Sequence, residues 1–123
     1  YSSAASDVYK RQSTIRALTS LNVSNNRTAT KEAGKALAEA LASNSVLREL
    51  NFSSNAGFYE SDGPGFAQEL AIGVSANGAL ETITFGDNQA VTMKADMTEA
   101  NFSSKGLSAS GAMIAAAFLP KCQ

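Results

Sequence analysis

A nine-residue pattern returns along the chain and restricts the folds that it can adopt. "LTSLNVSNN" begins at position 18, "LRELNFSSN" at 47 and "LETITFGDN" at 80, so that the period is 29 residues and then 33. Each copy has apolar residues at its first, fourth and sixth positions and an asparagine at its ninth. Units repeated at such a period stack into a solenoid, because each unit buries its apolar face only against its neighbours.

Each copy predicts a short strand followed by a turn. Apolar residues two positions apart, such as Leu21 and Val23, indicate a strand with one buried face. The asparagine side chain at the end of each copy both donates and accepts hydrogen bonds, which suits a turn. We expect these structural turn asparagines to pair with backbone groups of neighbouring turns; they are Asn26, Asn55 and Asn88.

Between the strands, the apolar residues follow the period of a helix. Residues 31–45 predict a helix that has Thr30 as its N-cap and ends near Asn44. Its apolar residues fall on one stripe, formed by Ala33, Leu37, Ala40 and Leu41.

Two further segments predict helices. Residues 63–79 place an apolar stripe along one side, formed by Phe66, Leu70 and Val74. Residues 108–122 predict the last helix, for which Ser108 or Ser110 is the expected cap.

These motifs resemble the leucine-rich repeats of the ribonuclease-inhibitor type. The resemblance covers residues 16–123 and is carried by the phased copies of "LxxLxLxxN", with "EAGKALAEAL" and "GFAQELA" after the first two. It implies an α/β fold: a leucine-rich-repeat solenoid, shaped as a short horseshoe of about three to four repeats, with parallel strands on the concave side and helices on the convex side. The expected repeats are 18–46, 47–79 and 80–123, the last with an irregular insertion at 88–98.

The pattern weakens after the third copy. Residues 97–107 can be aligned as a fourth copy, with Phe102 at the sixth position and Lys105 in place of the asparagine. Two structures compete for residues 88–102: a hairpin followed by a fourth strand, or an irregular loop. The alternation in "AVTMKADM" favours extended structure, and we predict a fourth strand at 99–103.

The first residues of the chain, 1–12, fit no repeat. Their sequence, "YSSAASDVYKRQ", resembles translated sequencing-adaptor read-through, and the alternative is a disordered N-terminal linker. It has no apolar core of the kind that a signal peptide needs. On either interpretation, we expect a non-native or disordered leader that lies outside the domain.

The composition argues against several classes of function. Histidine is absent, which removes histidine-based triads, imidazole bases and the commonest metal ligand. The 10 basic and 11 acidic residues give a net charge of −1 and form no basic stripe for nucleic acid. The longest strongly apolar stretch, 111–119, is far shorter than the roughly 20 residues that a membrane span needs. We therefore expect no catalytic site, no cofactor, no metal, and no nucleic-acid or membrane partner.

The chain has one cysteine, Cys122, so no intrachain disulfide can form. The absence of a disulfide framework indicates either a reducing compartment or a fold that needs no disulfides, and we expect a cytoplasmic protein. Because no histidine is present to activate the thiol, we expect Cys122 to be structural or incidental.

The concave face that the resemblance implies is the candidate site for a partner. Side chains that alternate with the buried leucines point out of it. The face is polar and slightly acidic, without the tryptophan or tyrosine that usually anchors a tight interface. Its candidate residues are Ser20, Asn22, Ser24, Asn25, Glu49, Asn51, Ser53, Thr82, Thr84, Asp87, Glu99 and Asn101.

The resemblance implies a non-catalytic protein–protein interaction module that is a fragment of a larger leucine-rich-repeat protein. The alternative is a GTPase-regulating scaffold of the same repeat type, for which Asn25, Arg27 and Asp87 are the candidate loop residues. End repeats of a solenoid usually carry polar caps, and neither end of this chain has one in its sequence. We therefore expect a marginally stable chain that exposes apolar surface at both ends.

Overall fold

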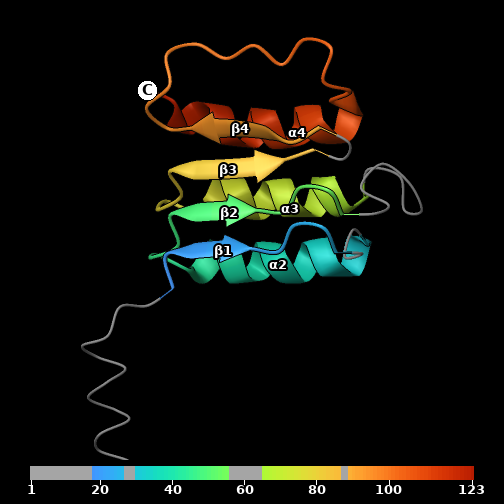
Figure 1. The fold of residues 1–123 in the computed structure, drawn as a ribbon. Coiled ribbons are helices and arrows are strands. Elements are labelled where there is room, and N and C mark those ends of the chain that lie inside the picture. The colour runs from blue at the N-terminus through green and yellow to red at the C-terminus, as the bar shows by residue number, and fades with distance from the viewer. Residues whose placement is uncertain (1–17, 27–29, 56–64, 87–88) are drawn as a thin grey trace, which may run out of the picture.

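The computed structural model of the protein describes residues 18–26, 30–55, 65–86 and 89–123. In this part of the chain, strands and helices alternate until the third strand, which a fourth strand follows directly (Figure 1). The elements are β1 (Ser20–Asn22), α2 (Lys31–Ser43), β2 (Glu49–Asn51), α3 (Gly65–Ala76), β3 (Thr82–Phe85), β4 (Val91–Lys94), α4 (Ser108–Phe118) and the 3-10 helix η1 (Leu119–Lys121).

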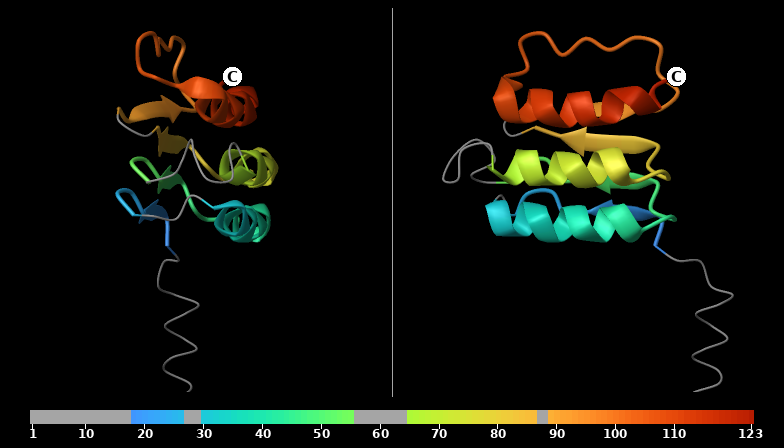
Figure 2. Two further views of the ribbon diagram at one scale, coloured as in Figure 1. Left: turned by 90° about the vertical axis from the view of Figure 1, so that its right-hand side faces the viewer. Right: turned by 180° about the vertical axis from the view of Figure 1, so that it is seen from behind.

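The strands form one open sheet in the order β1-β2-β3-β4. The first three strands run parallel, as predicted, and β4 pairs antiparallel with β3. The described helices all lie on one face of the sheet, so that this part of the chain forms two layers (Figure 2). The predicted α/β class is confirmed. We call residues 18–46, 47–79 and 80–123 the first, second and third units.

The core lies between the sheet and the helices. The stripe predicted on α3, formed by Phe66, Leu70 and Val74, is 0% exposed. It packs with the inward-facing residues of the strands and of α4, which include Leu50, Phe52, Ile83, Phe85, Ile114 and Phe118. Full burial of one such side chain contributes roughly 1.5–3 kcal/mol, so these contacts between units hold the layers together.

Helix α2 begins and ends where the sequence predicted. The Thr30 Oγ1 accepts a hydrogen bond from the Ala33 N–H at 3.1 Å, and Asn44 is the C-cap. The predicted stripe is only partly correct, because Leu41 is buried whereas Ala40 is exposed. The buried side of α2 instead includes Gly34 and Ala38, which face α3 rather than the sheet.

Helices α2 and α3 approach closely because glycines lie at their contact. A Cβ built on Gly34 would lie 2.6 Å from the carbonyl oxygen of Phe66. A Cβ built on Gly73 would lie 2.4 Å from the Cα of Ala38. No side chain larger than hydrogen fits at either position without separating the helices.

The cap predicted for α4 is wrong. The residue at the N-cap position is Leu107, whose side chain makes no capping hydrogen bond. Ser108 is the first residue of the helix, and Ser110 is buried within it. The first turn is closed by backbone alone, because the Gly111 N–H donates to the Leu107 carbonyl at 3.0 Å.

The fourth strand lies earlier in the chain than predicted. The extended structure expected from the alternation in this region is confirmed, since Val91 and Met93 of β4 are buried and Thr92 and Lys94 are exposed. A strand at 99–103 is not formed. Residues 91–94 reach the free edge of β3 through a short connection, which costs less loop-closure entropy than a longer one. Once they pair there, that edge is no longer available.

The tetrapeptide "NFSS" nevertheless forms the same turn twice. In the second unit, the Asn51 Oδ1 accepts a hydrogen bond from the Ser53 N–H at 3.0 Å; near residue 100, the Asn101 Oδ1 accepts one from the Ser103 N–H at 2.9 Å. The last serine of each copy has a positive φ, 56° at position 54 and 57° at position 104. The turn is therefore local, and it forms without strand pairing.

Phe102 extends a column of aromatic rings that begins at Phe52, directly after β2. The rings of Phe52 and Phe85 are stacked with centroids 6.3 Å apart, and the Phe102 ring meets Phe85 edge-on at 6.3 Å. Figure 1 shows the segment that carries Phe102, residues 95–107, passing over the end of the stack beyond β4. The fourth copy of the repeat thus supplies its apolar side chain to the core without supplying a strand.

The two ends of the stack differ, although the sequence predicted apolar exposure at both. On the side of the first unit, Leu18 is 61% exposed, as predicted. At the other edge of the sheet, β4 pairs with β3, and Met97, Phe102 and Leu107 pack against the core. At this end the prediction is correct only in part: the edge of β3 and the side chain of Phe118 are covered, whereas Leu119, in the apolar segment near the end of the chain, is 62% exposed.

Candidate functional site

The face of the sheet that points away from the helices carries two rows of polar side chains. The strand register aligns one residue of each strand in each row. We call these eight residues the sheet face. The first row is Ser20, Glu49, Thr82 and Lys94, and the second row is Asn22, Asn51, Thr84 and Thr92.

Cross-strand hydrogen bonds connect neighbours within these rows. The Ser20 Oγ donates to the Glu49 Oε1 at 3.1 Å, and the hydroxyls of Thr84 and Thr92 lie 3.0 Å apart. Such pairs typically contribute 0.2–1 kcal/mol each to the pairing of strands. The rows therefore help to order the sheet and still present polar groups to solvent.

Six of the predicted site residues lie on the sheet face and are at least partly exposed: Ser20, Asn22, Glu49, Asn51, Thr82 and Thr84. Asn51 also takes part in the turn that follows β2. The Asn51 Oδ1 accepts hydrogen bonds from the N–H of Ser53 at 3.0 Å and from its hydroxyl at 2.7 Å. Ser24 and the exposed Asn25 follow β1, and Asn25 has a φ of 60°.

Other predicted site residues do not lie on this face. Ser53 is only 5% exposed, because its hydroxyl turns back to Asn51. Glu99 and Asn101 are exposed, but they belong to the segment between β4 and α4 instead of a strand. Asp87, Asn88 and Arg27 lie outside the described residues.

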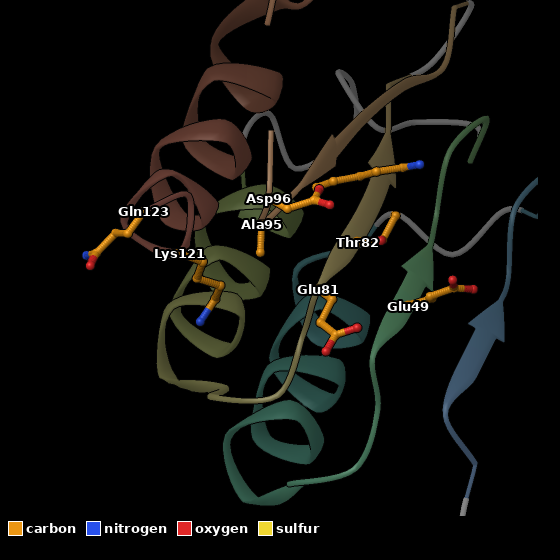
Figure 3. A pocket seen from close by; sticks show the side chains of 8 residues that line it. Glu49, Glu81, Thr82, Ala95, Asp96, Lys121 and Gln123 are labelled. Carbon is orange, nitrogen blue, oxygen red and sulfur yellow. The ribbon is translucent and has the colours of Figure 1, made fainter. Parts of the chain in front are cut away.

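A cleft of about 580 Å³ opens beside the first row, near the start of the parallel strands (Figure 3). Strand residues lie on one side of the cleft and residues at the end of the chain on the other. Its lining combines three carboxylates with two ammonium groups, and consists of Glu49, Glu81, Thr82, Lys94, Ala95, Asp96, Lys121 and Gln123.

A second cleft of about 410 Å³ adjoins the first and shares Glu81, Ala95, Lys121 and Gln123 with it. The Nη1 of Arg48 lies 3.5 Å from the Oε2 of Glu81 in this cleft. Both side chains are about half exposed, so this ion pair contributes little to stability and can rearrange around a ligand. The two clefts offer charges of both signs, which suits a polar partner surface more than a small apolar ligand.

The sequence did not identify the residues that β4 and the end of the chain bring to the site. Thr92 and Lys94 complete the rows, and Asp96 and Lys121 line the cleft. The alternation of apolar and polar residues around Met93 could have predicted that Thr92 and Lys94 are exposed. Pairing with β3, which places them beside Thr82 and Thr84, is a long-range contact with no local signal.

Two of the turn asparagines, Asn26 and Asn55, lie in the turns that follow β1 and β2. The Asn26 Nδ2 donates to the carbonyls of Val23 and Ser24 at 3.1 and 3.2 Å. The buried Asn55 Nδ2 donates to the Phe52 carbonyl at 2.6 Å and also reaches back to Val23 in the first unit, at 3.3 Å. Asn55 therefore connects adjacent units.

A second pair of asparagines, Asn44 and Asn77, connects the first two units at the ends of α2 and α3. The sequence did not predict this connection. The Asn77 Nδ2 donates to the carbonyls of Leu41 and Asn44 in the first unit, both at 2.9 Å. Its Oδ1 accepts from the N–H groups of Ala79 and Leu80. Asn44 and Asn77 each lie three residues before a buried leucine, and this shared spacing was available in the sequence.

Lys121 makes the corresponding contact to the second unit. Its Nζ donates to the carbonyl of Asn77, as the Asn77 amide donates to the carbonyl of Asn44. Lys121 lies three residues after the buried Phe118, as Asn77 does after Val74. The ammonium group thus both lines the cleft and fixes the end of the chain to the second unit.

The described residues contain no cluster of three or more side chains suited to a metal ion. The half-buried Cys122 thiol lies 3.6 Å from the carbonyl of Lys94 and 3.9 Å from that of Phe118. Among the described helices, none has the length and apolar character needed to cross a membrane.

The sheet face and its cleft are therefore a polar surface built on ordered strands, with hydroxyl, amide and charged groups available to a partner. Comparisons with protein-family models, with curated proteins and with solved structures give no match to this chain.

Proposed function

We propose that the chain is a leucine-rich-repeat segment of the ribonuclease-inhibitor type that binds a protein partner, without catalysis, through the sheet face. The single observation that supports this proposal most is the alignment of two polar rows across all four strands. Side chains that are held in register on a rigid scaffold lose little conformational entropy on binding.

The chemistry of the face favours a polar partner surface. The rows supply hydroxyl and amide groups, and the adjoining cleft supplies carboxylates and ammonium groups. Protein interfaces of moderate affinity use such contacts together with bridging water. Because the face lacks tryptophan and tyrosine, which carry most binding energy in tight complexes, we expect moderate affinity.

The test needs a captured partner and matched surface variants. Proteins captured by the immobilised chain are purified, and their Kd is measured for the wild type and for Thr82→Arg and Thr92→Arg. These substitutions place a long charged side chain on each row, and we expect Kd to rise about tenfold or more, equivalent to about 1.4 kcal/mol. The control is Gln68→Arg, an exposed position on α3 in the helical layer.

The control should bind like the wild type, because the helical layer is the opposite face of the molecule (Figure 2). A captured protein that binds Thr82→Arg and Thr92→Arg as tightly as the wild type, but loses affinity for Gln68→Arg, would move the site to the helices. Circular dichroism of each variant excludes unfolding as the cause.

The GTPase-regulating scaffold remains a second proposal. Of its candidate residues, Asn25 is exposed after β1, and Arg27 and Asp87 lie outside the described residues. Single-turnover GTP hydrolysis by a small GTPase, measured with and without the chain, tests it. Faster hydrolysis that is lost in Arg27→Ala supports this role, and an unchanged rate contradicts it.

A further inference from the structure

Strand β4 has one edge that pairs with β3 and an outer edge that faces away from it. The Ala95 N–H donates to the Glu81 carbonyl at 2.8 Å, so residues 91, 93 and 95 direct their backbone groups toward β3. These directions alternate along a strand, and Thr92 and Lys94 therefore direct their N–H and C=O groups to the outer edge. Within the part of the chain that the structure describes, the Thr92 N–H and C=O form no hydrogen bond there.

The residues that follow β4 begin a hairpin toward this edge. The Met97 N–H donates to the Lys94 carbonyl at 3.1 Å. This is the first hydrogen bond of a hairpin whose two loop residues are Ala95 and Asp96. We call residues 97–107 the strap. Figure 1 shows the strap running back across the end of the stack, opposite in direction to β4, as an antiparallel partner of that strand would run.

The hairpin bond defines the register in which the strap would meet β4. Continued from the pair of Lys94 and Met97, this register opposes Thr92 to Glu99. These two residues would then exchange both of their backbone hydrogen bonds, which satisfies the groups that Thr92 directs outward. Side chains of opposed residues lie on the same face, so Glu99 and Asn101 would lie beside Thr92 on the exposed side of the sheet.

The polarity of the strap matches this register. Because side chains alternate along a strand, Ala100 and Phe102 would lie on the side of the helices. Phe102 already packs against the core and meets Phe85 edge-on. A shift by one residue would instead bring the charged Glu99 to the core side. Residues 99–101 are exposed and belong to no strand, so that they are available for pairing.

Two features hold the strap open in the structure. Neither Ala95 nor Asp96 has a positive φ, whereas the tight hairpin turns that suit the twist of paired strands require at least one. The Met97 side chain packs against the core, but in the hairpin it would lie on the same face as Lys94, which is exposed. Closure therefore exchanges the packing of Met97 and the present turn for hydrogen bonds with Thr92.

We propose that the strap closes reversibly on the outer edge of β4, where residues 98–101 form a fifth strand of the described sheet. Closure adds Glu99 to the second row of the sheet face and brings Asn101 to the same side. A partner that contacts either residue there binds the closed state more tightly and shifts the population toward it. This coupling rests on the proposed function, whereas closure itself does not.

Disulfide trapping tests closure in the chain alone. Thr92→Cys and Glu99→Cys are combined in a Cys122→Ser background, because opposed residues of the closed pair have their Cα atoms about 5.5 Å apart, within disulfide range. The control combines Thr92→Cys with Ser104→Cys, a position of the strap beyond the paired residues. In a glutathione redox buffer, we expect the first pair to cross-link at least about tenfold faster than the control.

Variants at the turn and in the strap shift the equilibrium in opposite directions. Ala95→Asn combined with Asp96→Gly favours the tight hairpin turn, so the Thr92 amide should exchange with solvent at least about tenfold more slowly than in the wild type. Adding Glu99→Pro removes the N–H that pairs with Thr92 and should restore the exchange rate of the wild type. Adding Ala100→Pro is the matched control, because the Ala100 N–H points away from β4 in this register, and it should keep the slow exchange.

Equal cross-linking of the two cysteine pairs overturns the proposal. So does a Thr92 amide that exchanges as fast with the changed turn as with the natural one. If a captured partner binds the sheet face without protecting the amides of Thr92 and Glu99, the coupling is wrong and the proposed function stands. If the strap closes in a chain that captures no protein, closure is supported and the proposed function is not.

Discussion

Single amide side chains connect the units of this fold. Asn77 is 1% exposed, and its amide makes hydrogen bonds to four backbone groups, which belong to Leu41 and Asn44 in the first unit, Ala79 in the second and Leu80 in the third. Asn44 occupies the equivalent place one unit earlier, where its Oδ1 accepts from the N–H groups of Val46 and Leu47. The two asparagines occupy equivalent turns in successive units. Of the two side chains, only that of Asn77 also donates hydrogen bonds to the preceding unit.

We expect Asn77→Ala to destabilise the fold by about 2–4 kcal/mol, because a buried backbone group left without its partner costs about 1–3 kcal/mol. Asn44→Ala is the matched control and should cost about 1 kcal/mol, since it removes the hydrogen bonds of one turn only. Urea unfolding followed by circular dichroism measures both changes. Equal losses for the two variants would show that the connection between units contributes nothing.

At the scale of elements, the separation of α2 and α3 depends on glycine. We expect Gly73→Ala to destabilise the protein by about 1–3 kcal/mol, the usual cost of overpacking, because the new Cβ would collide with the backbone of Ala38. Alanine favours a helix by about 1 kcal/mol over glycine. The energetic cost of the collision must therefore exceed this gain for the substitution to destabilise the protein.

Gly78→Ala is the matched control for this prediction, because a Cβ at that position meets nothing within 4 Å. Thermal unfolding should show a lower Tm for Gly73→Ala and a nearly unchanged Tm for Gly78→Ala. An unchanged Tm for both would mean that the helices separate at no cost.

The elements show how far the sequence could predict the fold. The parallel strands and the helices were predictable because their apolar periods are local and repeat in phase. The position of the fourth strand was not, since "NFSS" forms the same turn at 51–54 and at 101–104, and only competition for the edge of β3 decides which segment pairs. For the same reason Thr92 and Lys94 of the site were missed and Glu99 was misplaced.

At the scale of the whole molecule, the two ends of the sheet should differ in local stability. Among the residues that the structure describes, the second unit is packed on both sides, whereas the first unit is packed only against the second. In a stack of units, stability is approximately the sum of terms for each unit and for its interfaces. A unit with one interface therefore opens more readily than a unit with two.

We expect the backbone amides of α2 to exchange with solvent at least about tenfold faster than those of α3, a difference of about 1.4 kcal/mol in the free energy of opening. Hydrogen exchange measured by mass spectrometry, at a concentration where the chain is a monomer, gives both rates. Equal protection of α2 and α3 would mean that the chain opens only as a whole and that the end position has no effect.

The buried Asn77 also has a consequence for chemical ageing. It is followed by Gly78, and an asparagine before glycine deamidates readily when the glycine N–H nitrogen can reach the side-chain carbonyl carbon. Here, hydrogen bonds hold the amide toward other backbone groups on both of its sides. We expect isoaspartate at Asn77 to accumulate in urea and to remain near background in the native chain, as measured by peptide mapping; equal rates would contradict this. Isoaspartate that forms during a long period of unfolding would persist after refolding. Because the modified residue lacks the amide donor, such a molecule would refold less well.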